Sequence, residues 1–374
     1  MRDLIILGAG AAGLFCAKYL QTKDYLIIEH NSKLARKLAI SGGGRCNVTN
    51  KYVKAEDFFS KDPAFIRGVL QRYSNKDLLK WLKDQGCALQ LKNATQYFCS
   101  KSAQQLIKLL YTPNILYDTE ICDVTYDKSF VVHTSKGTFR SKALLVATGG
   151  LSYKKIGASG IGFEIAKKFG HTLYPLAPAL VGLTLQKEQF WFKELSGISL
   201  PVTIAVADRR LKGNLLFAHR GISGPAVLDA SLFWQRGKIT VSFLERLPRL
   251  NPKKQLTTQL PLPKRFIKRF LQEIGLEDKR VALYSKKDLE AIKSLCHYSF
   301  APAGTFGYER AEVTRGGVLL SELDLNMQSN LQKGLFFAGE VCDATGRLGG
   351  YNIQWAFSSG FVAAKGIDTY LANC

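Results

Sequence analysis

Three glycines near the start of the chain have the spacing of a nucleotide-binding turn. Gly8, Gly10 and Gly13 form Gly-x-Gly-x-x-Gly between an apolar run at residues 4–7 and a helix-compatible segment. The first glycine permits a tight turn, the second lets a pyrophosphate approach the backbone, and the third lets helix and strand pack closely. Glu29 lies 21 residues after Gly8, where its carboxylate can accept hydrogen bonds from a ribose diol. The pattern predicts a dinucleotide whose phosphates lie at a helix N-terminus.

Two further glycine clusters argue against a simple NAD-binding domain. Residues 41–47 read Ser-Gly-Gly-Gly-Arg-Cys-Asn, which offers several backbone N–H groups beside a guanidinium. Gly339 and Glu340 follow an apolar run, and Gly349 and Gly350 open an apolar helix at residues 351–365. A helix N-terminus at that point can stabilise negative charge on a flavin when the flavin is reduced. The three clusters together therefore favour FAD.

The elements around these clusters predict an α/β domain that a long insertion interrupts. We expect strands at residues 4–7 and 25–29, helices over about 56–110, and strands again over 115–148. Short β-like stretches separated by glycine and proline turns occupy about 180–245, and a lysine-rich helical pattern follows to about residue 299. A buried strand at 334–341 and the helix at 351–365 return to the α/β pattern.

Composition and charge narrow the class of protein. The 374 residues are 46% hydrophobic and 22% charged, as in a globular protein of two or three domains. Lys and Arg total 52 against 30 Asp and Glu, and the net charge of +22 favours a polyanionic partner such as RNA. The eight cysteines contain no Cys-x-x-Cys pair, so we expect no metal and reduced thiols. No stretch reaches the roughly 20 apolar residues that span a bilayer, so we expect a cytoplasmic protein without a membrane partner.

Several longer motifs, which together span nearly the entire chain, resemble the HI0933-like flavoproteins. That family includes bile-acid reductase and ribosomal-RNA dihydrouridine synthase branches. The motifs are Gly8 to Gly13, Arg36-Lys37-Leu38 with ISGGGRCNVTN (40–50), ATGGLSY (147–153), FAHRGISGP (217–225), AEVTRGGV (311–318) and FAGEVCDATGRLGGYNIQW (337–355). The chain departs from the family pattern at Ile161, where an acidic residue is expected, and at Cys342, where a leucine is usual.

The resemblance implies an α/β fold with three parts. These are a Rossmann-like FAD-binding domain of the glutathione-reductase type, an inserted β-barrel-like domain and a small helical domain. We expect the FAD-binding domain at residues 1–180 plus 310–374, the β domain at 181–248 and the helical subdomain at 249–309.

By position, the resemblance also assigns residues to the cofactor. The ADP half would be held by Gly8, Ala9, Gly10, Ala12, Gly13 and Glu29, with Thr148 and Gly149 nearby. The flavin half would be lined by Lys37, Ser41, Gly42, Gly44, Arg45, Cys46, Gly339, Glu340, Gly350, Tyr351 and Asn352. Reduction of a carbon–carbon double bond also needs a general acid, for which Cys46 and Tyr351 are the candidates. No second Gly-x-Gly-x-x-Gly unit is present, so NAD(P)H is expected as a transient reductant.

The favoured substrate is a uridine of large-subunit ribosomal RNA, which hydride from reduced FAD would convert to dihydrouridine. Basic pairs in the helical insert support this interpretation: Lys264-Arg265, Lys268-Arg269, Lys279-Arg280 and Lys286-Lys287. Phe266 and Phe270 between them could stack an unpaired base, although their four-residue spacing also fits a core-facing stripe. Two alternatives stay open. One is a small-molecule NAD(P)H-dependent ene-reductase or amine oxidase, and the other is a non-catalytic flavin-containing protein that binds RNA or senses redox state.

Overall fold

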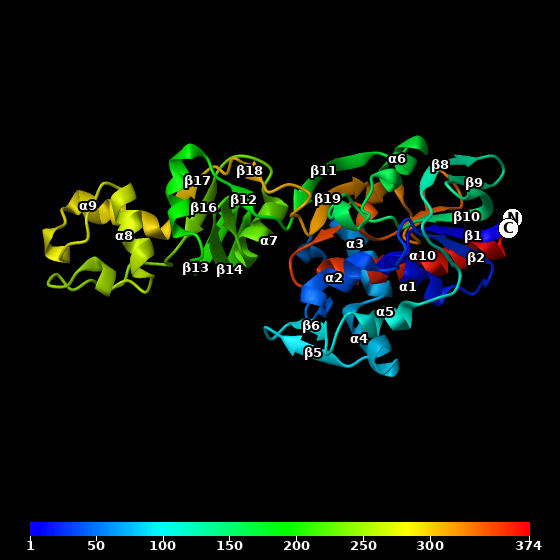
Figure 1. Cartoon of the computed structure of the whole chain (residues 1–374), viewed down its shortest axis with the longest axis horizontal. Coiled ribbons are helices and arrows are strands. Elements are labelled where there is room, and N and C mark those ends of the chain that lie inside the picture. Colours follow the sequence, from blue (N-terminus) through cyan, green and yellow to red (C-terminus); the bar gives the residue numbers. More distant parts are fainter. The chain divides into compact units, whose positions relative to one another are not determined.

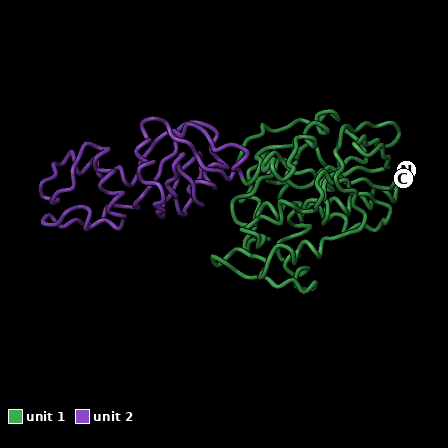
Figure 2. Tube along the Cα trace, viewed as in Figure 1, with its two compact units in different colours: residues 1–178, 312–374 green, residues 179–311 purple.

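The computed structural model describes residues 1–374 and divides them into two compact units (Figures 1 and 2). Unit 1 contains residues 1–178 and 312–374, and unit 2 contains residues 179–311. Unit 1 is therefore assembled from both ends of the sequence, and unit 2 is one continuous insertion. The division of the insertion into a separate β domain and helical subdomain stays a prediction.

A seven-stranded sheet forms the centre of unit 1. Its strands are β1 (Arg2–Leu7), β2 (Tyr25–Ile28), β7 (Ile115–Leu116), β8 (Ile121–Tyr126), β9 (Phe130–Thr134), β10 (Gly137–Val146) and β20 (Leu335–Phe337). The order β7-β2-β1-β10 is parallel throughout, and β20 pairs in parallel with the second half of β10. β9 pairs antiparallel with the first half of β10, and β8 pairs with β9. The parallel register brings the carboxyl ends of five strands to one edge of the sheet.

Two helices from opposite ends of the sequence pack together beside this sheet (Figure 1). They are α1 (Ala11–Tyr19) and α10 (Tyr351–Ala372). The ring of Phe15 lies 4.6 Å from that of Phe357, centroid to centroid. At Gly360 an added Cβ would lie 2.5 Å from the carbonyl oxygen of Ala12, so only a glycine lets the two backbones come this close. The C-terminal helix thereby supports the first strand–turn–helix unit.

The other elements of unit 1 surround this centre. The helices are α2 (Arg36–Gly44), α3 (Pro63–Arg72), α4 (Asn75–Asp84), α5 (Gln104–Leu110) and α6 (Ile161–Lys168). The smaller sheets are β3 (Asn47–Asn50) with β6 (Gln96–Cys99) and β5 (Leu89–Lys92), β4 (Phe58–Phe59) with β21 (Thr345–Gly346), and β11 (Leu173–Ala179) with β19 (Val313–Val318). None of the helices is both long and apolar enough to cross a membrane.

The predicted helical region over residues 56–110 is wrong in part. Helices α3, α4 and α5 lie there, but β5 and β6 form a hairpin between α4 and α5. Its turn contains Asn93 and Ala94, whose φ angles of 49° and 61° are left-handed. Asparagine tolerates this conformation because its side chain can bond the local backbone. Each of these strands has only four residues, which is too short for the alternation of apolar and polar residues to be recognised between amphipathic helices.

Unit 2 contains a second seven-stranded sheet, in the order β17-β16-β13-β14-β15-β12-β18. Its strands are β12 (Leu183–Thr184), β13 (Ser199–Val206), β14 (Arg209–Ala218), β15 (Gly221–Ser223), β16 (Ile239–Ser242), β17 (Tyr298–Phe300) and β18 (Gly304–Thr305). All pairings are antiparallel, and the terminal strands β17 and β18 do not pair with each other, so no closed barrel is observed. Helix α7 (Pro225–Phe233), which begins with a proline in its first turn, lies within the stretch that was predicted to be β-like.

The helical part of unit 2 packs aromatic side chains into its core. It contains α8 (Lys264–Glu273) and α9 (Lys286–Ile292), and a 3-10 helix at Lys187–Leu195 lies against α8. Phe266 and Phe270 on α8 are both 0% exposed, and the ring of Phe266 lies 4.8 Å from that of Phe243. The suggestion that these phenylalanines stack an RNA base is therefore wrong, because neither ring reaches solvent.

Replacing Phe266 tests this assignment. We expect Phe266→Ala to lower the free energy of unfolding of the chain by about 3–5 kcal/mol, because it removes a buried ring and leaves a cavity. Phe190→Ala is the control, since Phe190 is 43% exposed in the same unit, and it should change stability by about 0.5 kcal/mol or less. Urea unfolding followed by tryptophan fluorescence measures both. Equal losses for the two variants would contradict the core position of Phe266.

Candidate functional site

Four of the predicted binding segments follow the carboxyl ends of strands in the central sheet. The glycine turn follows β1, Glu29 follows β2, Thr148 and Gly149 come after β10, and Gly339 with Glu340 come after β20. Because these strands are parallel neighbours, the four segments meet at one edge. Open α/β sheets bind their ligands in the crevice outside this edge.

The first and third glycines of the turn are required by packing, and the second faces open space. A Cβ at Gly8, where φ is 102°, would lie 2.6 Å from the carbonyl oxygen of Ala147. A Cβ at Gly13 would lie 2.2 Å from the carbonyl oxygen of Gly8. A Cβ at Gly10 would meet no atom within 4 Å. The backbone at Gly10 is therefore open to its surroundings, which leaves room for the ligand that the motif predicts.

Glu29 holds the turn in place. Its side chain is buried, and its Oε2 accepts a hydrogen bond of 2.8 Å from the backbone N–H of Ala9. Its Oε1 accepts from both the backbone N–H and the side-chain amide of Asn31, at 2.8 and 2.7 Å. Each carboxylate oxygen has two acceptor sites, so Oε2 keeps the capacity to accept a hydroxyl. The Glu29 carboxylate can thus hold the turn in position and bind a ribose at the same time.

An ion pair joins the N-terminal and C-terminal parts of the candidate site. Lys37 Nζ lies 2.5 Å from Glu340 Oε2, and the Glu340 side chain is largely buried. Glu340 Oε1 accepts from the backbone N–H of Thr314 at 2.8 Å, and Thr314 Oγ1 accepts from the N–H of Leu151 at 2.7 Å. Thr314 lies in the motif at 311–318 but is not among the predicted binding residues. Its role is to connect the segments after β10 and β20.

The glycine-rich segment at 41–44 forms the kinked end of α2. Ser41 has an extended ψ of 146°, and Gly42 and Gly43 are left-handed. Cys46 follows with a φ of 49°, is fully buried, and donates its N–H to the carbonyl oxygen of Ser41 at 2.9 Å. The Arg45 guanidinium instead lies on the exposed surface, 3.5 Å from Gln90 Oε1. The structure therefore does not bring the Arg45 guanidinium against any other predicted binding residue.

The N-terminus of α10 is fixed against β3. Gly350 precedes the helix with a φ of 94°, and a Cβ there would lie 2.7 Å from the carbonyl carbon of Thr49. The Asn352 side-chain amide accepts from the N–H of Gly346 and donates to its carbonyl oxygen, each at 2.8 Å. Asn352 thus shapes the loop before the helix. Tyr351, the first helical residue, is 8% exposed.

Buried polar atoms and open backbone indicate that these segments fit a dinucleotide. Thr148 Oγ1 and Asn47 Oδ1 are buried without a hydrogen-bond partner, which is costly in a folded protein. Cβ atoms at Gly10, Gly43 and Gly149 would each meet nothing within 4 Å. A ligand with phosphate, ribose and ring groups along this edge could satisfy the orphaned atoms and approach the bare backbone. The residues present therefore fit FAD.

Asp343 is a buried carboxyl that the sequence analysis did not single out. It is 0% exposed, its Oδ2 accepts from the backbone N–H of Lys61 at 3.0 Å, and its Oδ1 has no partner. Burial raises the pKa of Asp343 to about 6, and the hydrogen bond from Lys61 and the charge of Arg315 offset only part of that rise. The only sequence signal was its position in the long motif at 337–355.

Known proteins resemble this chain over its whole length. Residues 2–366 match the family described as the HI0933-like protein Rossmann domain. A ribosomal RNA dihydrouridine synthase of Haemophilus influenzae is 38% identical over 394 residues, which cover 97% of this chain and 98% of that protein. A 3-dehydro-bile acid delta(4,6)-reductase of Clostridium scindens is 27% identical, with 98% of both chains covered.

Among solved structures, the fold resembles that of 3-ketosteroid-delta4-(5alpha)-dehydrogenase from Rhodococcus jostii. The TM-score is 0.52, with 14% sequence identity and coverage of 99% of this chain and 96% of that chain. At this identity the similarity concerns the fold alone.

The space beside Gly10 can be tested by filling it. We expect Gly10→Ala to fold normally, because its φ of −87° suits alanine and no atom lies near the new methyl group. The methyl group would occupy the path of the phosphates, so flavin bound per purified chain should fall about tenfold or more. Flavin absorbance and thermal unfolding measure the two effects. Full flavin content in folded Gly10→Ala would contradict the assignment of this turn.

Asp343 predicts a pH dependence of stability. Its folded-state pKa of about 6 lies above the unfolded value of 3.8, so the folded state holds the proton more tightly. Asp343 therefore makes its full contribution to the free energy of unfolding below about pH 4. As the pH rises through 6, about 3 kcal/mol of that free energy is lost. Asp343→Asn should remove this loss. The free energy of unfolding of the variant minus that of wild type should therefore increase from pH 4 to pH 7. Urea titrations across this range measure the difference, and a difference that does not change with pH would contradict the raised pKa of Asp343.

Proposed function

The chain belongs to the HI0933-like family and is a flavoprotein oxidoreductase, and we propose that it reduces a uridine of ribosomal RNA to dihydrouridine. Full-length similarity to a ribosomal RNA dihydrouridine synthase is the observation that carries the proposal. The net charge of +22 supports it, because RNA is a polyanion. The ribosome as substrate would place the enzyme in the cytoplasm.

The cofactor site is proposed along the carboxyl edge of the central sheet. Bound FAD, once reduced, would supply a hydride to one carbon of the uracil C5=C6 bond. Gly10 and Glu29 are proposed to hold the ADP half, with the orphaned Thr148 hydroxyl as a further donor. The Lys37–Glu340 pair and the N-terminus of α10 are proposed to border the flavin half, where the positive end of the helix favours developing negative charge.

The other uracil carbon needs a proton, and we assign its donor to Tyr351 in preference to Cys46. The Cys46 thiol is fully buried and contacts the thiol of Cys99. Tyr351 is slightly exposed at the start of α10, directly after the glycine turn. A phenol hydroxyl can donate a proton to carbon and recover it from water. NAD(P)H is the proposed electron source and would be oxidised to NAD(P)⁺ in the same cycle.

A reductase for small conjugated ketones is the second candidate. It is favoured by the full-length similarity to the bile-acid reductase. That activity would use the same hydride chemistry on a different carbon–carbon double bond, so the cofactor residues alone do not separate the two. The higher identity to the RNA-modifying relative is the reason for our preference.

Mass spectrometry of ribosomal RNA tests the proposal. We expect cells without the gene to lose one dihydrouridine, detected as a uridine without its two added hydrogens, and the intact gene to restore it. Tyr351→Phe should bind flavin normally, be reduced by NAD(P)H, and form dihydrouridine about 10²- to 10⁴-fold more slowly, because the proposed proton donor is lost.

Cys46→Ser is the matched comparison and should keep most of the activity. If Cys46→Ser is inactive with flavin bound and Tyr351→Phe is active, the two roles are reversed. Unchanged ribosomal RNA in the deletion strain would overturn the RNA function and leave the reduction of a small enone as the proposal.

A further inference from the structure

The exposed face of α8 in unit 2 carries closely spaced cations. They are Lys264, Arg265, Lys268 and Arg269. Residues four apart on a helix lie on the same side, separated by a rise of about 6 Å. The cations therefore form two short rows, Lys264 with Lys268 and Arg265 with Arg269. Since the opposite face of α8 is the apolar core, the orientation of these rows is fixed.

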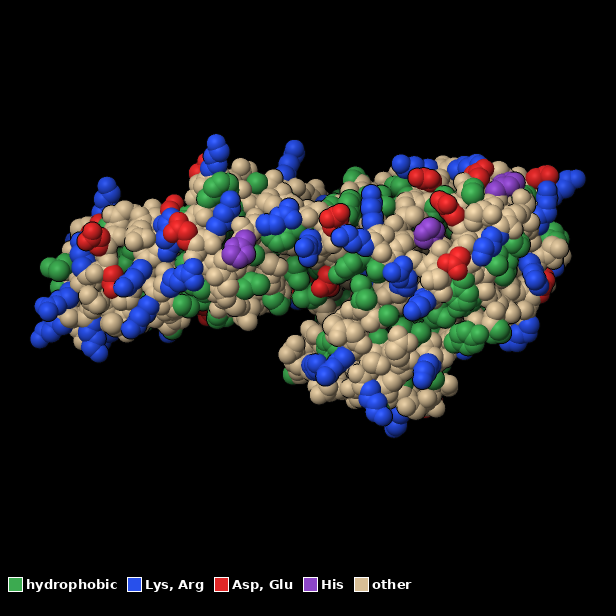
Figure 3. Space-filling model, viewed as in Figure 1, with side chains coloured by type: hydrophobic (Ala, Val, Ile, Leu, Met, Phe, Trp, Pro, Cys, Tyr) green, Lys and Arg blue, Asp and Glu red, His purple; other side chains and the backbone are tan.

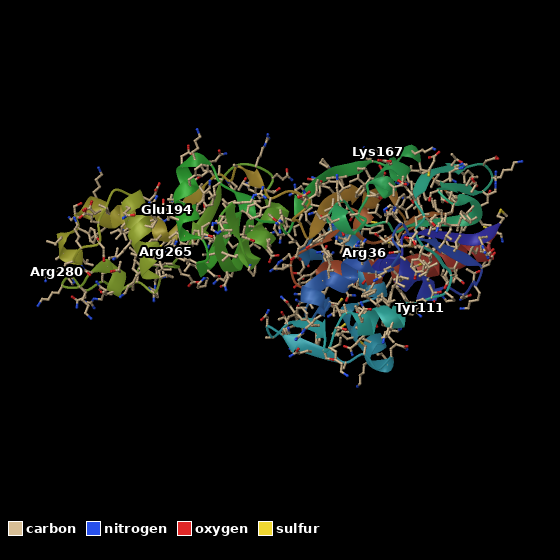
Figure 4. The ribbon with its side chains drawn as sticks, viewed as in Figure 1. Arg36, Tyr111, Lys167, Glu194, Arg265 and Arg280 are labelled. Atoms are coloured by element: carbon tan, nitrogen blue, oxygen red, sulfur yellow. The ribbon has the colours of Figure 1, made fainter.

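The four cations line a hollow of about 450 Å³. Glu194, Leu195 and Gln272 complete its lining, so four cations face a single carboxylate. Figure 4 shows Glu194, from the 3-10 helix at Lys187–Leu195, beside Arg265 of α8. Lysine and arginine side chains crowd the surface of this part of unit 2 in Figure 3. Arg269 also forms an ion pair with Glu273, at 3.4 Å, but the cations still outnumber the carboxylates, so the hollow is positive.

Glu194 holds the two arginines in position. The Arg265 guanidinium donates to the carbonyl oxygen of Glu194, and Arg269 Nε donates to Glu194 Oε2 at 2.9 Å. Arg269 also lies over the ring of Trp191, 5.6 Å from its centroid. Each guanidinium has five N–H donors, so these contacts leave donors for a ligand. An anion would thus meet cations whose conformations are already restricted, which lowers the entropy cost of binding.

Helix stability alone does not explain these charges. Lys264 and Arg265 occupy the first turn of α8, where the helix dipole disfavours cations. The first turn contains no acidic residue, and Pro263 before it provides no side-chain cap. A bound anion would offset both the charge repulsion among the cations and the uncapped N–H groups.

We propose that this hollow docks the phosphate backbone of the RNA substrate. The proposal rests on the RNA function proposed above and assigns recruitment to residues outside the candidate cofactor site. A repeating polyanion is favoured over a single small anion because the positive charge continues beyond the hollow. Lys279, Arg280, Lys286 and Lys287 lie in the same helical part of unit 2. A chain of phosphates can neutralise several such cations together.

A pair of charge reversals tests the docking surface. Lys264→Glu/Lys268→Glu is compared with Arg236→Glu/Lys238→Glu, which makes the same charge change at exposed residues of the same unit. The probe is a large-subunit ribosomal RNA transcript. Each phosphate contact contributes about 0.7–0.9 to the slope of log affinity against log salt, so the α8 variant should lose about 1.5 from that slope. We expect its KM for the transcript to rise about tenfold or more, with kcat and flavin content unchanged, and the control to match wild type.

The outcomes separate this proposal from the function on which it rests. An unchanged salt slope in the α8 variant, or an equal change in the control, overturns the docking surface. If the α8 variant loses as much affinity for poly(glutamate) as for the RNA transcript, RNA is overturned in favour of an acidic protein partner. If wild type forms no dihydrouridine but the slope still falls as expected, the enzymatic proposal fails and the docking surface stands.

Discussion

The parallel pairing of β20 with β10 is the contact on which the architecture of unit 1 depends. It sets Phe337 opposite Val146 although the whole of unit 2 lies between them in the sequence. Closing so long a loop costs conformational entropy, but that cost grows only slowly with loop length. Three consecutive pairs of fully buried residues provide the compensating contacts. Once the pair forms, Gly339, Glu340 and the start of α10 are carried to the edge where the N-terminal glycine turn already lies.

The ion pair between Lys37 and Glu340 connects the N-terminal and C-terminal segments at this edge. A partly buried pair gains little from charge attraction alone, because both groups lose water. Glu340 recovers part of that loss through the backbone N–H of Thr314, so its second oxygen is also satisfied. The pair therefore fixes the relative positions of α2 and the C-terminal segment more than it adds stability. Such fixed positions are what a cofactor needs if its ring and its phosphates are to be held by different parts of the chain.

The parts of the site that follow local rules could be predicted from the sequence, and the parts that depend on tertiary contacts could not. Gly8, Gly13 and Glu29 act through a turn, a strand and a helix that are consecutive in the chain, so their spacing encodes their geometry. Thr314 has no such pattern, because its hydrogen bonds go to residues 26 and 163 positions away. The burial of Asp343 and the outward direction of Arg45 likewise depend on segments that approach only after folding. In the fold, the β5–β6 hairpin was missed since each strand has only four residues, and α7 was missed since it is buried on nearly all sides and its sequence shows no amphipathic period.

The two units differ in the chemistry that their side chains offer. Every predicted cofactor residue lies in unit 1, whereas the hollow of unit 2 contains cations, one carboxylate and no buried nucleophile. Under the proposed function, the reaction centre only adds hydrogen across a double bond, which places few demands on the rest of the substrate. Selection of that substrate can then depend on the insertion, whose surface is free to vary without disturbing the carboxyl edge of the sheet. On this argument, we expect the relative named as a bile acid reductase and the relative named as a ribosomal RNA dihydrouridine synthase to differ mainly in the residues that select the substrate. The difference between them should then lie in the charge of the inserted helices.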